Sequence, residues 1–373
     1  MKLNLSITLT STLLIFSSFY LTKFGLSPVY FLLPCLFLSW FLLSISNDSN
    51  KITIDFILLI SLLSIVILIF NNILRANEYT WPIIVNYIIA IICLLIGRDL
   101  IGKITRRDAV VAIHYYNLFV IAIVTIDTVF RFKYPIINDI FQSQGSDLWF
   151  YQYKRSFILG DSNVVSILLM TTIFFNIFFM KKMCVSIKYK SVIIVAFFIL
   201  LFLTFSRAAY LATTIGIIYA TVYSNIYRRF IFYIVGVILC LALIPYLINV
   251  VTHDGSGSTK LGELSNVINY YQNVDTIYNA FFGVGFGNGI YVMDMYIHGL
   301  FAKLLVEGGL MFFFAFTLLM YCIYKIERMV LILYVPLFIA SISLSFYILS
   351  AFQGAVIGLV LFISKMSVKH NEL

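Results

Sequence analysis

The chain has 373 residues, of which 62% are hydrophobic, 17% are aromatic and only 11% are charged, and its formal net charge is +9. About 25% of the residues of an ordinary soluble domain are charged, because polar side chains must cover its exterior. The composition therefore excludes secreted globular, nucleic-acid-binding and disordered proteins and indicates an integral membrane protein.

A helix that crosses the hydrocarbon core of a bilayer needs about 20 mostly apolar residues. Twelve segments are suitable: 4–22, 27–45, 53–70, 81–97, 110–129, 163–180, 191–206, 208–226, 230–250, 299–323, 329–350 and 352–364. Each is continuously apolar, whereas the strands of a membrane barrel alternate apolar and polar residues. We therefore predict an all-α polytopic bundle of about twelve transmembrane helices that forms one membrane domain over residues 1–373.

Arg207 marks the boundary between two of these spans. It is the only charged residue among the 37 that separate Lys190 from Arg228. As a single helix this segment would extend about 55 Å at about 1.5 Å per residue, far more than a hydrocarbon core of about 30 Å. We therefore expect the chain to reverse at Arg207, directly after Thr204-Phe205-Ser206, at one face of the membrane.

Lysine and arginine set the orientation, because they gather on the cytoplasmic side of membrane proteins. Of the 25 such residues, sixteen fall on one side of the predicted spans and eight on the other, and Lys303 lies within a span. The side with sixteen is therefore predicted to be cytoplasmic, and both termini lie on it.

Two outer segments are much longer than the short, basic cytoplasmic connections. Residues 131–162 form the first large outer loop and residues 251–298 form the second. Both combine acidic residues with many Tyr, Asn and Gln, and long loops of such mixed character usually perform a function. Side chains of these types stack on sugars and hydrogen-bond to them, so we expect the active face of the protein to be the outer one.

Three basic residues occupy the outer ends of predicted spans: Arg155, Arg207 and His298. The planar guanidinium of arginine binds phosphate or pyrophosphate oxygens in pairs and stays charged. His298 can act as a neutral acceptor, a base or a cationic donor. The alternative is a structural role, in which the arginines reach to the membrane surface or pair with Asp161 or another acid, and His298 is a structural hydrogen-bonding residue.

Two further charged pairs have the spacing of one helical turn. Lys303 and Glu307 lie within a predicted span, and charged residues there tend to face the bundle interior or a water-filled cavity. We therefore expect their helix to line a polar cavity. Asp127 and Arg131, at the end of the fifth span, are expected to pair. The glycine-rich stretch 283–289 is expected to form a turn that returns the second loop to the membrane.

Several kinds of chemistry have no signature in the chain. No Walker, GxSxG, HExxH or EF-hand pattern occurs, and His253 with Asp254 does not make a metal site. The five cysteines are scattered, mostly inside apolar runs, and indicate no disulfide framework. Nothing in the sequence therefore indicates ATP-driven transport, hydrolase chemistry or a metal centre.

Four pieces of the sequence, in order, resemble the superfamily of Wzy-type O-antigen polymerases and O-antigen ligases, which are bacterial membrane glycosyltransferases. The pieces are an arginine before a Gly-x-x-Asn helix start, a Ser-Arg pair at a helix turn, a Gly-Val-Gly-x-Gly-Asn stretch, and a histidine that opens a helix with a Glu-Gly-Gly turn below it. In this chain they are Arg155 with Gly160 and Asn163, Ser206-Arg207, Gly283 to Asn288, and His298 with Glu307-Gly308-Gly309. The chain departs from the family in two places, since the second loop contains no arginine and Gly299 follows the histidine where many relatives have Asn.

The resemblance implies an O-antigen polymerase of lipopolysaccharide biosynthesis, embedded in the bacterial inner membrane with its active site facing the periplasm. The donor would be a glycan on undecaprenyl pyrophosphate, and the acceptor a hydroxyl of a second lipid-linked repeat unit. Arg155 and Arg207 would bind the pyrophosphate, and His298 would activate the hydroxyl or orient the donor phosphate. Asn163, Lys303 and Glu307 would line the cavity. No cofactor, nucleotide sugar, metal or nucleic acid is expected; membrane lipid and a chain-length regulator protein are the candidate partners.

Two alternatives remain open. An O-antigen ligase uses the same donor but transfers the glycan to lipid A-core, and the sequence separates it poorly from a polymerase. A lipid-linked oligosaccharide flippase or another secondary transporter belongs to a different class. Twelve spans and the Lys303–Glu307 pair suit a transporter, whereas the long outer loops and the lack of a detectable repeat between the two halves argue against one.

Overall fold

The computed structural model describes residues 5–19, 28–31, 34, 38, 56–73, 75–99, 105–135, 152–183, 187–223, 227, 234, 255–273, 276–293, 297, 299–342 and 348–371. Some predicted features lie outside these residues. They include His298, most of the predicted span 27–45, nearly all of the predicted span 230–250, and residues 136–151 of the first outer loop.

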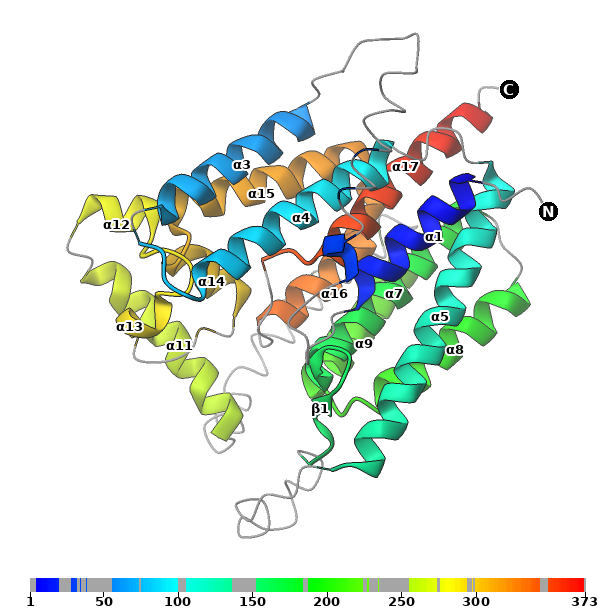
Figure 1. Ribbon diagram of the computed structural model, residues 1–373, viewed down its shortest axis with the longest axis horizontal. Coiled ribbons are helices and arrows are strands. Elements are labelled where there is room, and N and C mark those ends of the chain that lie inside the picture. Colours follow the sequence, from blue (N-terminus) through cyan, green and yellow to red (C-terminus); the bar gives the residue numbers. More distant parts are fainter. Residues whose placement is uncertain are drawn as a thin grey trace.

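The described residues form helices that pack side by side, together with one short hairpin (Figure 1). In chain order the elements are α1 (Leu5–Ser18), α3 (Phe56–Asn72), α4 (Thr80–Asp99), α5 (Arg106–Lys133), β1 (Arg155–Ser156), β2 (Gly160–Asp161), α7 (Ser162–Lys182), α8 (Ile187–Phe202), α9 (Arg207–Val222), α11 (Gly255–Gln272), α12 (Ile277–Phe282), α13 (Gly289–Met293), α14 (Leu300–Val306), α15 (Gly309–Ile326), η3 (Arg328–Val330), α16 (Leu331–Ser341) and α17 (Ala351–Asn371). The prediction of a helical fold is confirmed for this part of the chain.

Four of the described helices are long and apolar enough to cross a membrane, namely α4, α5, α7 and α15. The first three correspond to the predicted spans 81–97, 110–129 and 163–180. Other apolar helices, among them α3 and α8, are shorter. The apolar helices support the prediction that the protein is embedded in a membrane. The predicted number of twelve spans is not confirmed.

The prediction of one continuous helix over 299–323 is wrong, because α14 ends at Val306 and α15 begins at Gly309. Gly309 has a φ of +69°, a left-handed conformation that glycine adopts without strain. A Cβ at Gly309 would lie 2.2 Å from the backbone nitrogen of Gly283. The helix is therefore broken where the second outer segment docks directly on its backbone.

Glycines bring α4 and α17 into backbone contact. A Cβ added at Gly354 would lie 2.0 Å from the carbonyl oxygen of Ala90, and one at Gly358 would lie 2.3 Å from that of Leu94. Gly354 and Gly358 are four residues apart and share one helix face, a spacing that allows membrane helices to approach closely. The close crossing of these two helices therefore depends on the absence of side chains.

Buried polar side chains join α5 to α7. The Asn117 amide donates to Asn176 Oδ1 at 2.8 Å, and the Asn176 amide donates back to Asn117 Oδ1 at 2.9 Å. The hydroxyls of Tyr116 and Thr172 share a hydrogen bond of 2.8 Å. Because the hydrocarbon core offers no water to satisfy such groups, these bonds favour one particular pairing of the two helices.

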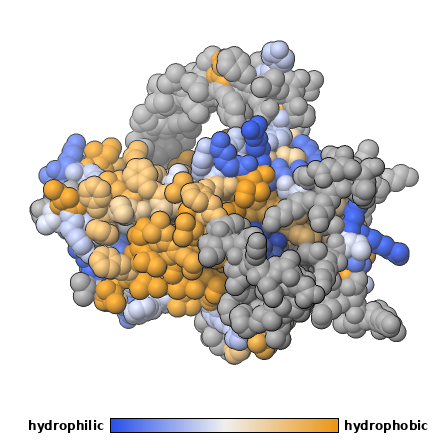
Figure 2. Space-filling model, turned by 90° about the horizontal axis from the view of Figure 1, so that it is seen from above, coloured by the Kyte–Doolittle hydropathy of each residue, from blue (hydrophilic) through white to orange (hydrophobic). Residues whose placement is uncertain are grey.

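A broad apolar surface covers the side of the molecule that α3 occupies (Figure 2). Large exposed apolar side chains follow α3 along its length and include Phe56, Leu59, Leu63, Val66 and Phe70. A contiguous apolar surface of this extent suits contact with lipid rather than with water. We therefore expect this to be the lipid-facing side of the bundle.

The described parts of both predicted outer segments lie away from the end of α17. In Figure 1, β1 lies at the bottom and α11, α12 and α13 lie at the left, whereas α5 begins and α17 ends at the upper right. This arrangement is compatible with the predicted location of both segments on one side of a membrane.

Candidate functional site

A buried ion pair lies at the end of α5. Arg131 Nε donates to Asp127 Oδ2 at 3.0 Å, and both side chains are inaccessible to solvent. The two residues are four apart and share one helix face, so the pairing predicted from their spacing is confirmed. Two buried charges need further hydrogen bonds to offset their loss of hydration, and other segments of the chain supply these bonds.

The Arg131 guanidinium joins the short helical turn before β1 to the turn between α8 and α9. Its Nη1 donates to the carbonyl oxygen of Leu203 at 3.0 Å and to that of Tyr153 at 3.4 Å. Tyr153 is two residues before Arg155, and Leu203 is four residues before Arg207. The buried Arg131 side chain therefore contacts two segments, one that carries Arg155 and one that carries Arg207.

Asp127 holds the first strand of the hairpin. Its Oδ1 accepts from the Ser156 hydroxyl at 2.8 Å and from the backbone N–H of Phe157 at 3.0 Å. Successive side chains of a strand point to opposite faces. Because Ser156 is buried against Asp127, the preceding Arg155 is exposed.

Asp161 lies opposite Arg155 across the hairpin, but its carboxylate caps the next helix instead. It accepts from the backbone N–H of Asn163 at 2.7 Å, at the start of α7. Within the part of the chain that the structure describes, no residue forms a hydrogen bond or ion pair with the Arg155 guanidinium. The alternative pairing of Arg155 with Asp161 is therefore not observed. Asn163 is partly buried in the first turn of α7.

The turn between α8 and α9 presents Arg207, which is the first residue of α9 and is exposed. The predicted reversal of the chain at this point is confirmed. Phe205 adopts a φ of 55°, which is uncommon for a bulky residue. Its ring lies 6.1 Å, between centroids, from those of Phe132 and Tyr153. These aromatic contacts hold the turn of Arg207 beside the strand of Arg155.

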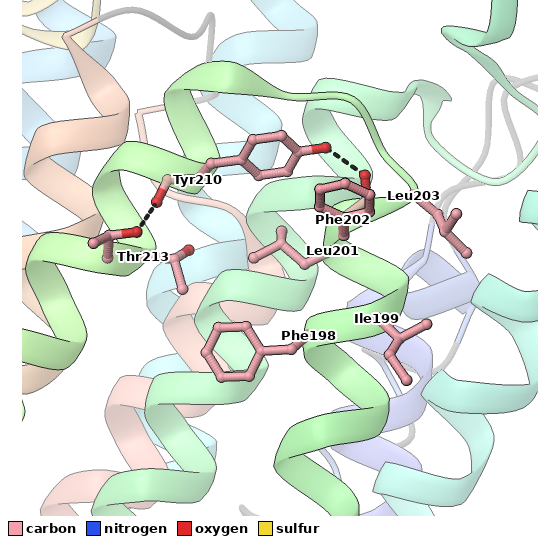
Figure 3. A pocket seen from close by; sticks show the side chains of 8 residues that line it. Phe198, Ile199, Leu201, Phe202, Leu203, Tyr210 and Thr213 are labelled. Atoms are coloured by element: carbon pink, nitrogen blue, oxygen red, sulfur yellow. Dashed lines mark hydrogen bonds between the residues drawn. The ribbon is translucent and has the colours of Figure 1, made fainter.

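An apolar groove of about 440 Å³ lies between α8 and α9 (Figure 3). Phe198, Ile199 and Phe202 of α8 line it, as do Tyr210 and Thr213 of α9. The Tyr210 hydroxyl donates to the carbonyl oxygen of Phe202 at the end nearest the α8–α9 turn, as Figure 3 shows. The groove therefore has apolar walls and ends within one helical turn of a cationic side chain.

Lys303 and Glu307 form a second polar cluster, at the break between α14 and α15. Lys303 Nζ lies 3.9 Å from Glu307 Oε2, within ion-pair distance, as their spacing allows. Glu307 is only 4% exposed, and its Oε1 accepts from the backbone N–H of Gly289 at 3.2 Å. Its Oε2 has no hydrogen-bond partner among the described residues. Lys303, Glu307 and Asn163 do not line the α8–α9 groove.

The glycine-rich stretch packs on this helix break, as the predicted turn requires. Gly283, Gly285 and Gly287 have φ values of +69°, +91° and +86°. The backbone N–H of Val284 donates to the Val306 carbonyl at 2.9 Å, and that of Gly285 donates to the Glu307 carbonyl at 3.0 Å. The positive φ angles thus let the second outer segment hydrogen-bond to the end of α14.

Amides of the α3–α4 turn hold the same stretch, and sequence reasoning missed them. Asn72 Oδ1 accepts from the backbone N–H of Phe286 at 2.7 Å, and the Asn77 amide donates to the Gly287 carbonyl at 3.1 Å. Four polar side chains crowded into residues 71–77, between two apolar spans, are the sequence signal for this contact.

Arg75, in the same turn, reaches the beginning of the glycine-rich stretch. Its guanidinium donates to Asn279 Oδ1 at 2.7 Å and to the carbonyl oxygen of Gly283. It also lies over the ring of Tyr278, 4.8 Å from the centroid. The second outer segment lacks an arginine of its own, and one from the preceding turn stabilises it.

Two polar contacts connect α11 to α14. Glu263 is only 5% exposed, and its Oε1 accepts from the backbone N–H of Gly299 at 2.7 Å. Burial raises the pKa of Tyr271 to about 12, so its hydroxyl stays protonated and donates to the Leu305 carbonyl at 2.8 Å. A Cβ at position 299 would lie 3.0 Å from Glu263 Oε1, so a larger residue there would require the Glu263 carboxylate to shift. His298, the adjacent residue, lies outside the described part of the chain.

Helix α16 lies between α9, which begins at Arg207, and α14, which carries Lys303. The ring of Phe338 on α16 packs against that of Phe301 on α14, with centroids 5.9 Å apart. On its other side, Pro336 approaches α9 so closely that a Cβ at Gly216 would lie 2.9 Å from it. The structure therefore joins the segments that carry Arg155 and Arg207, and it holds Lys303 and Glu307 in a separate cluster.

Comparison of the chain with protein-family models, curated proteins and solved structures found no match. Among the described residues, no three His, Cys, Asp or Glu side chains lie close enough together to hold a metal ion. The functional interpretation therefore rests on the residues themselves and on their geometry.

Proposed function

We propose that the protein is a polysaccharide polymerase that joins oligosaccharide repeat units carried on undecaprenyl pyrophosphate, at the periplasmic face of the bacterial inner membrane. One observation carries the proposal beyond the sequence resemblance. A single buried guanidinium, that of Arg131, hydrogen-bonds to the backbone two residues before Arg155 and four residues before Arg207, and so joins the segments that carry these two exposed cations.

Two such cations suit the chemistry of this reaction. The hydroxyl oxygen of the acceptor bonds to C1 of the donor sugar while the bond from C1 to the pyrophosphate oxygen breaks. Pyrophosphate is already a good leaving group, so the protein has mainly to stabilise its charge and to align the acceptor. Arg155 and Arg207 bind the pyrophosphate oxygens, and His298 takes the proton of the hydroxyl or orients the donor phosphate.

The groove between α8 and α9 suits the lipid part of the donor. Its walls are apolar, and α8 exposes Val192, Val195 and Ile199 along the same helix. A prenyl chain that entered the groove from the bilayer would have its pyrophosphate near the first turn of α9. Lateral entry of this kind explains why the enzyme would be embedded in the membrane.

The direct test uses purified protein in nanodiscs, supplied only with lipid-linked repeat units. We expect a ladder of polymer in the presence of a metal chelator and without nucleotide or an ion gradient. Failure to join two units, with lipid-linked substrate still bound, would contradict the proposal.

Lipid extraction from a deletion strain separates the polymerase from the ligase, which uses the same donor. Loss of the ladder, with single repeat units still attached to lipid A-core, supports the polymerase. Complete polymer that remains on undecaprenyl pyrophosphate supports the ligase.

A secondary transporter is the second candidate, because the α14–α15 segment is interrupted beside a buried charged pair. Interrupted membrane helices often form the substrate sites of transporters, and Glu307 with Lys303 lies at such a point. Reconstituted vesicles distinguish the two functions: movement of lipid-linked units across the bilayer without any joining favours the transporter.

A further inference from the structure

Helix α12 presents apolar side chains to its surroundings, although it belongs to the predicted outer loop rather than to a span. Ile277 is 80% exposed and Phe281, one helical turn later, is 45% exposed. None of the six residues of α12 is charged. Exposure of these apolar side chains to water would be unfavourable.

The exposed side chains of α12 continue the apolar surface of α3. The ring of Phe282 packs edge-on against that of Phe70, with centroids 5.7 Å apart. Phe70 is itself 57% exposed on the lipid-facing side of α3. In Figure 1, α12 lies at the end of α3 and α15, so that no other described helix separates it from this surface.

Exposed aromatic residues mark the same end of the bundle. Tyr79 and Trp81, at the start of α4, are each 51% exposed, and Tyr278 on α12 is 39% exposed. The start of α4 is bonded directly to the segment after α12, since the Thr80 hydroxyl donates to the Phe286 carbonyl at 2.6 Å. Tyrosine and tryptophan gather where the acyl chains of a bilayer meet the headgroups.

We propose that α12 is seated in the outer leaflet of the bilayer, where Ile277 and Phe281 contact lipid acyl chains and Tyr278 lies at the headgroups. The occupant of this surface is lipid because the surface is continuous with that of α3 and is bordered by interfacial aromatic residues. Burial of apolar side chains in acyl chains is favourable for the same reason as burial in a protein core. The second outer segment is thus anchored in the membrane, and this conclusion does not depend on the proposed enzymatic function.

Anchoring fixes the depth of the groups that follow α12. The glycine-rich stretch begins immediately after it and hydrogen-bonds to the end of α14, where Glu307 lies. The α14–α15 break therefore lies at the level of the lipid headgroups rather than out in the aqueous phase.

The experiment measures the accessibility of spin labels in nanodiscs of phosphatidylglycerol and phosphatidylethanolamine. Ile277→Cys and Phe281→Cys are labelled separately, in a background in which the five native cysteines are replaced by alanine. Phe70→Cys is the control on the lipid-facing side of α3, and Asn273→Cys, an exposed polar position after α11, is the control for the aqueous phase. Molecular oxygen reports contact with acyl chains, and a water-soluble nickel complex reports contact with water.

We expect labels at 277 and 281 to gain oxygen accessibility and to lose nickel accessibility relative to position 273, and so to resemble position 70. Nickel accessibility equal to that at position 273 would overturn the proposal. Exclusion of both reagents would also overturn it, because the helix would then be covered by protein, such as a second copy of the chain. Each position is informative alone, so a failure of one variant to fold leaves the test intact.

Discussion

The guanidinium of Arg131 lies 3.0 Å from the carboxylate of Asp127, and neither side chain reaches solvent. Asp127 accepts its remaining hydrogen bonds from the hairpin. Arg131 donates to Thr128 on the same helix, to Tyr153 before the hairpin and to Leu203 in the α8–α9 turn. The pair therefore joins the segments that carry Arg155 and Arg207, although neither of its members is accessible to a substrate.

Removal of one member of this pair should destabilise the protein strongly. Arg131→Met leaves the Asp127 charge buried and unpaired, which costs about 3–5 kcal/mol. Replacement of both residues, as in Asp127→Leu with Arg131→Met, should cost less than the sum of the two single substitutions. Thermal unfolding in detergent for the four proteins of this cycle measures the difference. Additive losses would show that the two charges do not interact.

Arg207→Ala should abolish polymer formation at normal protein levels, and Arg155→Ala should weaken it strongly. A hydrogen bond to a charged group is worth about 1.5–3 kcal/mol, so each lost bond should reduce turnover by roughly 10-fold to 100-fold. The matched control is Lys133→Ala, an exposed cation at the end of α5, which should keep the wild-type ladder. A normal ladder in Arg207→Ala would remove this residue from the mechanism.

Substitutions of His298 distinguish its two proposed roles. His298→Ala should abolish polymer in either case. His298→Gln keeps a hydrogen-bonding group but cannot accept a proton from the acceptor hydroxyl. If His298 is the base, the Gln variant should be as inactive as the Ala variant in the in vitro assay. Partial activity of the Gln variant would instead indicate that the histidine orients the donor phosphate.

Gly309→Ala should weaken the attachment of the second outer segment to α14. The added methyl group would require a strained positive φ and would lie 2.2 Å from the Gly283 nitrogen, and strain of this type costs about 1–3 kcal/mol. Gly262→Ala is the control, because no atom lies within 4 Å of the added Cβ there. Limited proteolysis should cleave residues 276–293 faster in the Gly309 variant than in the control. Equal rates would mean that the backbone at Gly309 is free to adapt.

Much of the fold follows from simple patterns in the sequence. Apolar length predicts α4, α5 and α7. An uninterrupted helix over 191–227 would be too long for a bilayer, and this length predicts the reversal at Arg207. The four-residue spacing predicts the Asp127–Arg131 and Lys303–Glu307 pairs. These successes share one cause, since each depends on interactions that are local in the chain.

The sequence does not predict the contacts that assemble the site. Arg131 donates to the backbone carbonyls of Tyr153 and Leu203, and a carbonyl has no residue-specific signature. The break before Gly309 is indicated only in part, because the Glu307-Gly308-Gly309 stretch suggests a turn whereas the apolar length of 299–323 favours one continuous helix. It arises from contact with Gly283, which is distant in the sequence.

The reciprocal amide bonds of Asn117 and Asn176 have a consequence for biosynthesis. During synthesis α5 emerges before α7, and a lone Asn117 that entered the lipid would lose its hydration without gaining a partner. We therefore expect α5 to remain beside the insertion machinery until α7 arrives, so that the two helices leave it together. The release of α5 into the membrane would thus be coupled to the arrival of α7 through these buried amides.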